Sequence, residues 1–247
     1  MTEPLVTVVI PSLNQAKFLP AAIESALTQS VATEIFVMDG GSTDGSLAII
    51  EGYEDDLAGW VSAPDGGQAA AINGGIALGT APFVCWLNSD DILLEDGLLN
   101  LHARLTKVNT APAVYGQGLH INASGKRVGK YLTFGFSERL LASYCFICQP
   151  ATLIRRSCWD EIGGLDENLE LAMDYDLWWR LYRAFGPLTL TDKTCAANRK
   201  HLGTKTQNNL DQHYDESIFV VKKYYGSVPW KWHLMRPMMR GLRALGL

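Results

Sequence analysis

The chain has 247 residues, of which 47% are hydrophobic, 10% aromatic and 19% charged. These values are typical of a globular protein and exclude the disordered, collagen-like and disulfide-scaffold classes. The 21 basic and 26 acidic side chains give a net charge of −5, which argues against a nucleic-acid partner.

The charge is unevenly distributed along the chain. The last acidic residue is Glu216, and six basic residues follow it: Lys222, Lys223, Lys231, Arg236, Arg240 and Arg243. Residues 1–217 therefore carry a charge of −11, and the last 30 residues carry +6. We interpret the acidic body and the basic tail separately.

The N-terminal residues Met1–Pro4 lack the basic region and the long apolar run of a signal peptide. No stretch approaches the roughly 18–20 apolar residues of a membrane-spanning helix. We therefore expect a cytoplasmic protein. Cys145 and Cys148 have the spacing of a metal or redox pair, but no second pair accompanies them, so buried free thiols are the simpler interpretation.

In the first half of the chain, short apolar runs alternate with helical patterns. The predicted strands are 6–10, 34–38, 59–63 and 82–87, and the predicted helices are 16–29, 45–53, 68–78 and 97–107. The strands are apolar on both faces, as expected where helices cover a sheet on each side. This order predicts an α/β fold with a Rossmann-like, mostly parallel sheet.

The second half is less regular. Residues 113–121 and 126–132 resemble strands around a turn, and helical patterns follow at 137–143, 155–162 and 174–184. No repeat or linker composition interrupts the chain. We predict one domain over residues 1–226, with a regular first half (1–110) and a less regular second half (111–226), and a basic amphipathic tail at 227–247.

Polar residues follow each of the four predicted parallel strands. The strand ends are Pro11–Asn14, Asp39–Gly45, Asp65–Gln68 and Asn88–Asp91. Ligands bind at this edge of open α/β sheets, so we expect a ligand site there. Helix capping and turn formation explain part of the pattern, because Ser, Asp and Gly also serve those purposes.

The segment Asn88-Ser89-Asp90-Asp91 is the most chemically distinctive. Grouped carboxylates without cysteine beside them suit a hard cation such as Mg²⁺ or Mn²⁺. The alternative is a cap for the following helix. Other signatures are absent: the chain has no GxGxxG, no P-loop, no HExxH and no GxSxG sequence.

Six motifs in order resemble the family 2 glycosyltransferases of the GT-A fold. They are Val9–Asn14, Met38–Gly45, Gly67–Gly75, Leu87–Asp91, Gly163–Glu167 and Asp174–Arg180, and the resemblance spans residues 5 to 205. It implies a GT-A sheet with flanking helices and a C-terminal helical extension. It likewise implies that residues 1–110 form a nucleotide-sugar-binding half and residues 111–226 an acceptor-binding half. It also implies an inverting enzyme that moves a sugar from a nucleotide-diphosphate-sugar to an acceptor hydroxyl.

The resemblance assigns roles to individual residues. Those implied to surround the nucleotide and sugar are Pro11, Ser12, Asn14, Asp39, Asp65, Asn73, Asn88 and Ser89. The implied metal-side residues are Asp90, Asp91 and His201, and Asp174 matches the catalytic base. Two positions depart from the family pattern: Asn88 replaces the usual first aspartate, and Met173 replaces a glutamate that often precedes the base.

The helix pattern is consistent with Asp174 as a base, because Asp174 shares a face with Leu177 and Trp178 and so points inward. Asp176 faces elsewhere and is the weaker candidate. We expect a glycan or a lipid-linked acceptor. The alternatives are an inactive nucleotide-sugar-binding protein and a sugar nucleotidyltransferase, although the segment after the first strand lacks the Gly-rich, basic loop of the latter.

The tail, residues 227–247, mixes Trp, Met and Leu with Lys and Arg. This mixture is typical of a segment on an anionic membrane surface, and it predicts peripheral attachment to the inner face of the membrane. The alternative is a segment that packs on the domain. Pro237 and Gly241 both weaken a continuous helix there.

Overall fold

A nine-stranded mixed sheet forms the centre of the molecule. The computed structural model describes residues 3–244, without the side chains of residues 206, 207 and 238–244. The strand order is β3-β2-β1-β4-β8-β6-β9-β5, and β7 pairs with β6 beside this path. The predicted α/β class with flanking helices is confirmed.

The first half of the sheet is parallel. Its strands are β1 (Val6–Ser12), β2 (Thr33–Asp39), β3 (Gly59–Ser62) and β4 (Phe83–Trp86). The connecting segments are α1 (Leu19–Leu27), α2 (Ser46–Gly52), η1 (Glu54–Asp56) and α3 (Gln68–Leu78). Val8 packs with the core beside α1, whereas Val9 packs with the core beside α3, so successive residues of β1 face opposite helical layers.

The second half of the sheet is mixed. Its elements are β5 (Ile92–Leu93), α4 (Gly97–Lys107), β6 (Ala113–Asn122), β7 (Arg127–Lys130), α5 (Glu138–Ser143), η2 (Gln149–Ala151), β8 (Thr152–Arg155), α6 (Arg156–Ile162), α7 (Met173–Phe185) and β9 (Thr189–Lys200). Strand β8 is antiparallel to both β4 and β6, while β9 is parallel to β6. The sheet therefore continues across the boundary between the two predicted halves.

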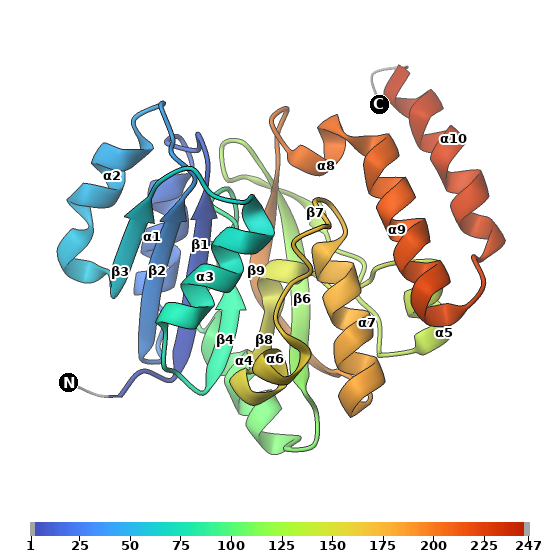
Figure 1. Cartoon of the computed structure of the whole chain (residues 1–247), viewed down its shortest axis with the longest axis horizontal. Coiled ribbons are helices and arrows are strands. Elements are labelled where there is room, and N and C mark those ends of the chain that lie inside the picture. Colours follow the sequence, from blue (N-terminus) through green and yellow to red (C-terminus); the bar gives the residue numbers. More distant parts are fainter. Residues whose placement is uncertain (1–2, 245–247) are drawn as a thin grey trace.

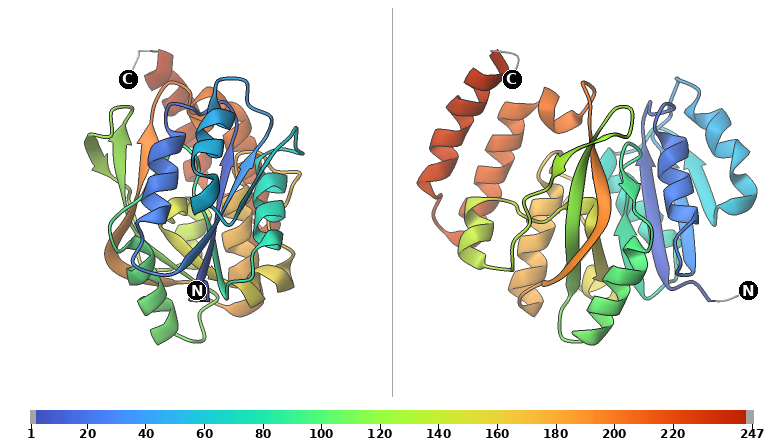
Figure 2. Two further views of the ribbon diagram at one scale, coloured as in Figure 1. Left: turned by 90° about the vertical axis from the view of Figure 1, so that its left-hand side faces the viewer. Right: turned by 180° about the vertical axis from the view of Figure 1, so that it is seen from behind.

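Helices cover both faces of the sheet. Figures 1 and 2 show α3, α6 and α7 on one face and α1 and α4 on the other. Two buried clusters fill these layers. Trp178 of α7 stacks on Trp86 of β4 with 6.1 Å between ring centroids and 13° between ring planes. This stack fixes the helix that carries Asp174 against the strand that leads into Asn88–Asp91.

Three helices extend the fold at the C-terminus. They are α8 (Lys205–Asn208), α9 (Leu210–Tyr225) and α10 (Trp230–Ala244). The helix α10 continues through Pro237 and Gly241, although both residues disfavour a helix interior. Trp232 is buried and its Nε1 donates to the carbonyl oxygen of Ala142 at 2.8 Å, so the start of α10 packs on the domain.

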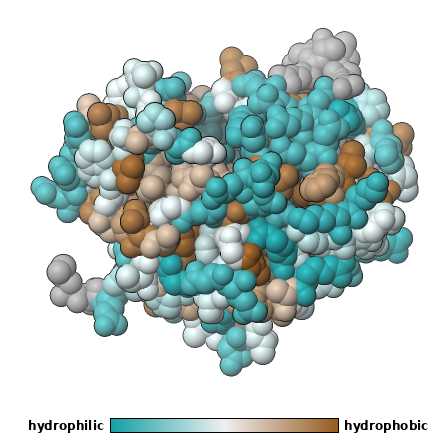
Figure 3. Space-filling model, in the orientation of Figure 1, coloured by the Kyte–Doolittle hydropathy of each residue, from teal (hydrophilic) through white to brown (hydrophobic). Residues whose placement is uncertain are grey.

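The distribution of apolar residues on the surface is relevant to the predicted membrane attachment. On the face shown in Figure 3, hydrophilic residues cover most of the half that carries α7 and α9. Apolar residues gather over the half that carries β3 and α3 (Figure 3). Within residues 3–244, no helix is both long and apolar enough to span a bilayer. The side chains of Arg240 and Arg243 and all of residues 245–247, which belong to the predicted basic tail, lie outside the described part of the chain.

Candidate active site

The loops after β1 and β2 are joined by hydrogen bonds. The backbone N–H of Asn14 donates to Ser42 Oγ at 2.7 Å, and the backbone N–H of Thr43 donates to Asn14 Oδ1 at 2.8 Å. Asn14 has a φ of 53°, in the left-handed region that asparagine tolerates better than most residues. Asn14 therefore shapes this edge of the site by tying the two loops together.

Asp39 is buried at the end of β2 and organises the same loop. Its carboxylate accepts hydrogen bonds from the backbone N–H groups of Gly41 and Ser42 at 3.2 and 2.9 Å. The hydroxyl groups of Ser42 and Ser62 also donate to it, the latter at 2.7 Å. A carboxylate offers about four acceptor positions. Three of the four donors share Oδ2, and Oδ1 accepts only from Ser42, so Oδ1 can accept a further hydrogen bond from a ligand.

Pro11 and Ser12 lie beside Asp39 on the neighbouring strand. Ser12 pairs with Asp39 in the sheet register, and both residues are buried. The Ser12 hydroxyl has no hydrogen-bond partner among the described residues. Buried polar atoms without partners are costly, and a bound ligand is one way to satisfy them. Asp65 approaches the same loop, since a Cβ added to Gly40 would lie 3.1 Å from Asp65 Oδ2.

Asn88 and Ser89 follow β4. The side chain of Asn88 accepts from Gln68 Nε2 at 2.8 Å and donates to Gln149 Oε1 at 3.3 Å. Gln149 is in turn fixed by donating to the carbonyl oxygen of Trp86 at 2.9 Å. Ser89 is buried. Sequence reasoning missed both glutamines, although Gln68 lies within the predicted strand-end segment Asp65–Gln68.

Asp90 and His201 meet across the site. His201 Nε2 lies 2.9 Å from Asp90 Oδ2, and their side chains are 10% and 20% exposed. The backbone N–H of Gly203 donates to His201 Nδ1 at 3.1 Å. Because Nδ1 accepts, Nε2 carries the proton in a neutral ring and donates to Asp90. In this arrangement His201 orients the Asp90 carboxylate.

The side chain of Arg199 holds the backbone of Asp90 in the pair of Asp90 and His201. Its Nε donates to the carbonyl oxygen of Asp90 at 2.7 Å, and Phe18 packs against both Arg199 and His201. The centroid distances from Phe18 are 4.9 Å to the guanidinium carbon and 4.7 Å to the imidazole. The sequence analysis did not assign Arg199 to the site. The proximity of Arg199 to His201, two residues further along the chain, could have indicated it.

Asp91 does not join Asp90 and His201, which corrects the expected three-residue metal group. It is 1% exposed, and its carboxylate accepts from the backbone N–H of Arg199 at 2.7 Å and from Asn198 Nδ2 at 3.3 Å. Burial, and then the charge of Asp90, raise the pKa of Asp91. Across the described residues, no three His, Cys, Asp or Glu side chains converge as a metal site. The chain turns at Asn88–Asp91, where the backbone N–H of Asp91 donates to the carbonyl oxygen of Asn88 at 2.9 Å, and the Asp91 side chain is buried beyond this turn.

Asp174 lies in the first turn of α7 and is half-buried. Burial raises the pKa of its carboxyl group to about 6. Hydrogen bonds from backbone N–H groups, among them that of Tyr175 at 2.7 Å, act in the opposite direction and lower the pKa. The charges of Asp91 and Asp174 both act on the Cys148 thiol and, after burial, help to raise its pKa. Asp91 and Asp174 are therefore both close enough to Cys148 for their charges to act on it.

The residues next to Asp174 on α7 are buried and pack or pair within the protein. Asp176 is fully buried, pairs with Arg180 at 2.5 Å and accepts from Tyr224 Oη at 2.8 Å. Trp178 and Trp179 are also fully buried, which removes both from any sugar-stacking surface. All five cysteines are free thiols, and burial raises the pKa of the pair Cys145 and Cys148.

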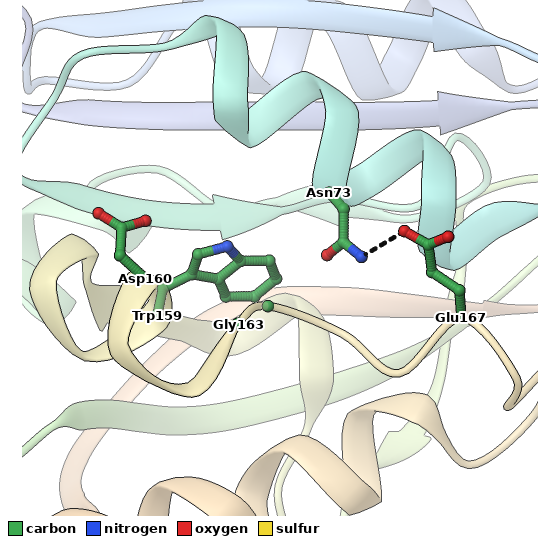
Figure 4. Close-up of a pocket in the computed structure, with 6 residues that line it drawn as sticks. Asn73, Trp159, Asp160, Gly163 and Glu167 are labelled. Carbon is green, nitrogen blue, oxygen red and sulfur yellow. Dashed lines mark hydrogen bonds between the residues drawn. The ribbon is translucent and has the colours of Figure 1, made fainter.

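Asn73 lies away from the strand-end loops, in a shallow pocket between α3 and the segment after α6 (Figure 4). The pocket has a volume of about 370 Å³ and is lined by Asn73, Trp159, Asp160, Gly163, Gly164 and Glu167. The Asn73 amide accepts from the backbone N–H of Leu165 at 2.9 Å and donates to Glu167 at 2.9 Å. It therefore joins the two halves of the chain, a role unlike the sugar contact that the resemblance implied.

Comparison with known proteins identifies the family. A family model described as "Glycosyl transferase family 2" matches residues 7–163. The chain belongs to glycosyltransferase family 2. The matched range contains Asp39, Asn88 and Asp90, whereas Asp174 and His201 of this family 2 glycosyltransferase lie beyond it.

Curated relatives and solved structures agree with this placement. The chondroitin synthase of Pasteurella multocida strain Pm70 is 26% identical over 223 residues, covering 89% of this chain and 23% of that protein. An uncharacterized glycosyltransferase of Rickettsia prowazekii, RP339, is 27% identical over 221 residues, covering 85% of this chain and 68% of its own length. The chain spans about a fifth to a third of the first three curated relatives it matches.

Among solved structures, S. aureus TarS 1-349 in complex with UDP-GlcNAc has a TM-score of 0.71 at 18% identity, covering 89% of this chain and 66% of that one. The mannosyltransferase PcManGT from Pyrobaculum calidifontis, solved with GDP-Man and Mn²⁺, has a TM-score of 0.66 at 17% identity, covering 89% and 65%. These similarities confirm the predicted GT-A fold of this family 2 glycosyltransferase.

Proposed function

We propose that the protein transfers a sugar from a nucleotide-diphosphate-sugar to an acceptor hydroxyl, with inversion at the anomeric carbon. The observation that carries this proposal is the position of Asp174. Its carboxyl group is half-buried in the first turn of α7 and has a pKa raised to about 6. The stack of Trp178 on Trp86 fixes α7 against the strand that leads into Asn88–Asp91. A base works best when its pKa lies near the working pH.

The donor is expected at the ends of β1, β2 and β4. The unpartnered hydroxyl of Ser12 and the buried carboxylate of Asp39 supply hydrogen-bonding groups for the nucleobase of the donor, beside Pro11. Asp65 lies beside Gly40 of the same loop, and Asn88 is held by two glutamines where it can bond a ribose hydroxyl. The solved relatives named with UDP-GlcNAc and with GDP-Man support a nucleotide-sugar donor without deciding which one.

Asp90 fits a divalent cation such as Mg²⁺ or Mn²⁺. Its side chain is partly exposed, and among the described residues no partner occupies its Oδ1. Mg²⁺ sites commonly use one or two carboxylates together with substrate phosphates. His201 could contribute only after its Nε2 proton moves, because Nδ1 now accepts from Gly203. A bound cation would neutralise charge on the departing diphosphate.

The chain's own contribution to the chemical step is proton transfer. The acceptor hydroxyl gives its proton to the carboxylate of Asp174 while its oxygen forms a bond to the anomeric carbon. The bond from that carbon to the diphosphate oxygen breaks, and the nucleoside diphosphate leaves with the electron pair. Attack from the face opposite the leaving group inverts the anomeric configuration.

We further propose that the acceptor is a growing glycan and that the product belongs to polysaccharide synthesis. The chondroitin and hyaluronan synthases among the relatives support this acceptor class. The chain corresponds to only part of those synthases, so the sugar and linkage are to be determined on this protein itself.

We propose that the protein works in the cytoplasm and that α10 attaches it to an anionic membrane surface. Trp230 and Leu234, one helical turn apart, are 67% and 58% exposed, and the exposed Lys231 lies beside them. No acidic residue occurs after Glu216, so the exposed charge of this segment complements anionic lipid.

The test is a screen of UDP-, GDP- and dTDP-sugars with and without Mn²⁺ or Mg²⁺, using oligosaccharide acceptors. We expect cation-dependent transfer from one donor class, and NMR of the product should show an inverted anomeric centre. Binding of nucleotide sugar with neither transfer nor donor hydrolysis would instead indicate a nucleotide-sugar-binding protein. Full activity after treatment with EDTA would contradict the role of the cation.

A further inference from the structure

The segment before Asp174 is held by a carboxylate from α9. Three consecutive backbone N–H groups, those of Glu170, Leu171 and Ala172, donate to Glu216 Oε2 at 3.1, 2.8 and 3.0 Å. The other oxygen of Glu216 accepts from Gln212 Nε2 at 2.9 Å. Glu216 is therefore fixed on its own helix while it binds the preceding loop.

This contact holds the residues that lead into α7, a helix whose N-cap makes no side-chain hydrogen bond. Ala172 stands at the N-cap of α7 and has no side chain that can bond the free N–H groups of the first turn. The carboxylate of Glu216 lies just before that turn, where the helix dipole also favours a negative charge. Leu171 is held a second time, because its carbonyl oxygen lies 3.4 Å from Nδ1 of His213 on α9.

We infer that Glu216 is a positioning residue for Asp174, a role that rests on the proposed transfer reaction. Asp174 is the second residue of α7, so the position of the loop that Glu216 binds determines the position of the Asp174 carboxylate. The stack of Trp178 on Trp86 fixes the same helix one turn further along. Together the two contacts fix the first two turns of α7, which carry Asp174, and Glu216 acts through this helix rather than on the reacting atoms.

The test compares Glu216→Ala and Glu216→Gln with a control on the same helix, Asp215→Ala. Asp215 is exposed and pairs with Arg236 rather than with the loop. We expect Glu216→Ala to lower kcat by about tenfold or more, because small misplacements of a catalytic group are costly. The Kd for the nucleotide sugar should change by no more than about twofold, since the donor loops are untouched. Glu216→Gln, which keeps an acceptor oxygen, should fall between wild type and Glu216→Ala.

Hydrogen exchange separates this inference from the proposed reaction. Amide exchange of residues 169–176 should become faster in Glu216→Ala and remain unchanged in Asp215→Ala. If the wild-type protein transfers no sugar, the proposed reaction fails, while the exchange rates still decide whether Glu216 orders the loop. The inference is overturned if exchange at 169–176 is unaffected, if kcat is unchanged, or if kcat and nucleotide-sugar affinity fall together.

Discussion

Two adjacent aspartates at the end of β4 have different surroundings. Asp90 faces His201 and keeps a partly exposed carboxylate, whereas Asp91 is buried and bonds the backbone of β9. The difference arises because the chain turns at Asn88–Asp91 and then enters β5, which pairs with β9 and brings Asp91 against that strand. One carboxylate is therefore available for a ligand, and the other holds two strands together.

Substitution at these two positions should separate activity from stability. Asp90→Asn should lower turnover by about tenfold or more while changing the free energy of unfolding by no more than about 0.5 kcal/mol. Asp91→Ala should lower the free energy of unfolding by about 2 kcal/mol, because it leaves the N–H of Arg199 and the amide of Asn198 unsatisfied. Urea denaturation and transfer assays measure both effects. Equal loss of stability in the two variants would contradict the assignment.

The raised pKa of Asp174 predicts the pH dependence of turnover. The base works in its ionised form, so kcat at saturating donor should rise with pH through about 6 and be roughly tenfold lower at pH 5 than at pH 7. Because the folded-state pKa is above the ordinary value, this group's contribution to stability declines as pH rises through the same range. A kcat that stays flat from pH 5 to 8, with nucleotide binding also unchanged, would contradict a base with this pKa.

At the scale of elements, α10 has two kinds of tryptophan. Trp232 is buried between Tyr175 and Tyr214, whereas Trp230 is exposed. Trp232→Ala should lower the free energy of unfolding by about 3–5 kcal/mol, and Trp230→Ala should change it by no more than about 0.5 kcal/mol. Thermal denaturation of the two variants measures this contrast. Equal effects would mean that α10 does not pack as described.

The exposed residues of α10 provide the membrane test. The variant Trp230→Ala/Leu234→Ala, and separately Lys231→Glu, should reduce cosedimentation with vesicles rich in phosphatidylserine by about tenfold. Leu132→Ala is a matched control, since Leu132 is 63% exposed and far along the chain from α10. Wild-type protein that binds neutral and anionic vesicles equally, or not at all, would contradict the membrane proposal.

At the scale of the molecule, the two halves share one sheet. Arg156 on α6 links them, because its guanidinium donates to Thr7 Oγ1 at 2.6 Å and to the carbonyl oxygens of Ile76 and Ala81. We therefore expect one cooperative unfolding transition, which Arg156→Ala shifts to lower denaturant without splitting it. Two separate transitions in the wild-type protein would show that the halves fold independently.

Sequence patterns predicted the regular half of this molecule better than the irregular half. The four parallel strands were found because apolar runs such as VTVVI are covered on both faces. Strand β8 has only four residues and runs directly into α6, so the sequence pattern showed the helix but not the strand before it. In β9, small and polar residues alternate irregularly, which hid a central strand.

The candidate site was predicted in the same uneven way. Strand ends located Asp39, Asn88 and Asp90, since parallel strands bring their carboxyl ends to one edge. The contacts of Asp91 and Asn73 depend on segments more than 90 residues away. Those of Glu216 join α9 to the loop before α7. Such long-range hydrogen bonds leave no local spacing in the sequence.

The most direct test of the central claim is the transfer rate of Asp174→Asn at saturating donor and acceptor. Asparagine keeps the size of the side chain but cannot accept the proton. We predict that kcat falls by about 10²–10⁴-fold while the Kd for the nucleotide sugar stays close to that of wild type. Turnover at the wild-type rate in a correctly folded Asp174→Asn variant would contradict the account.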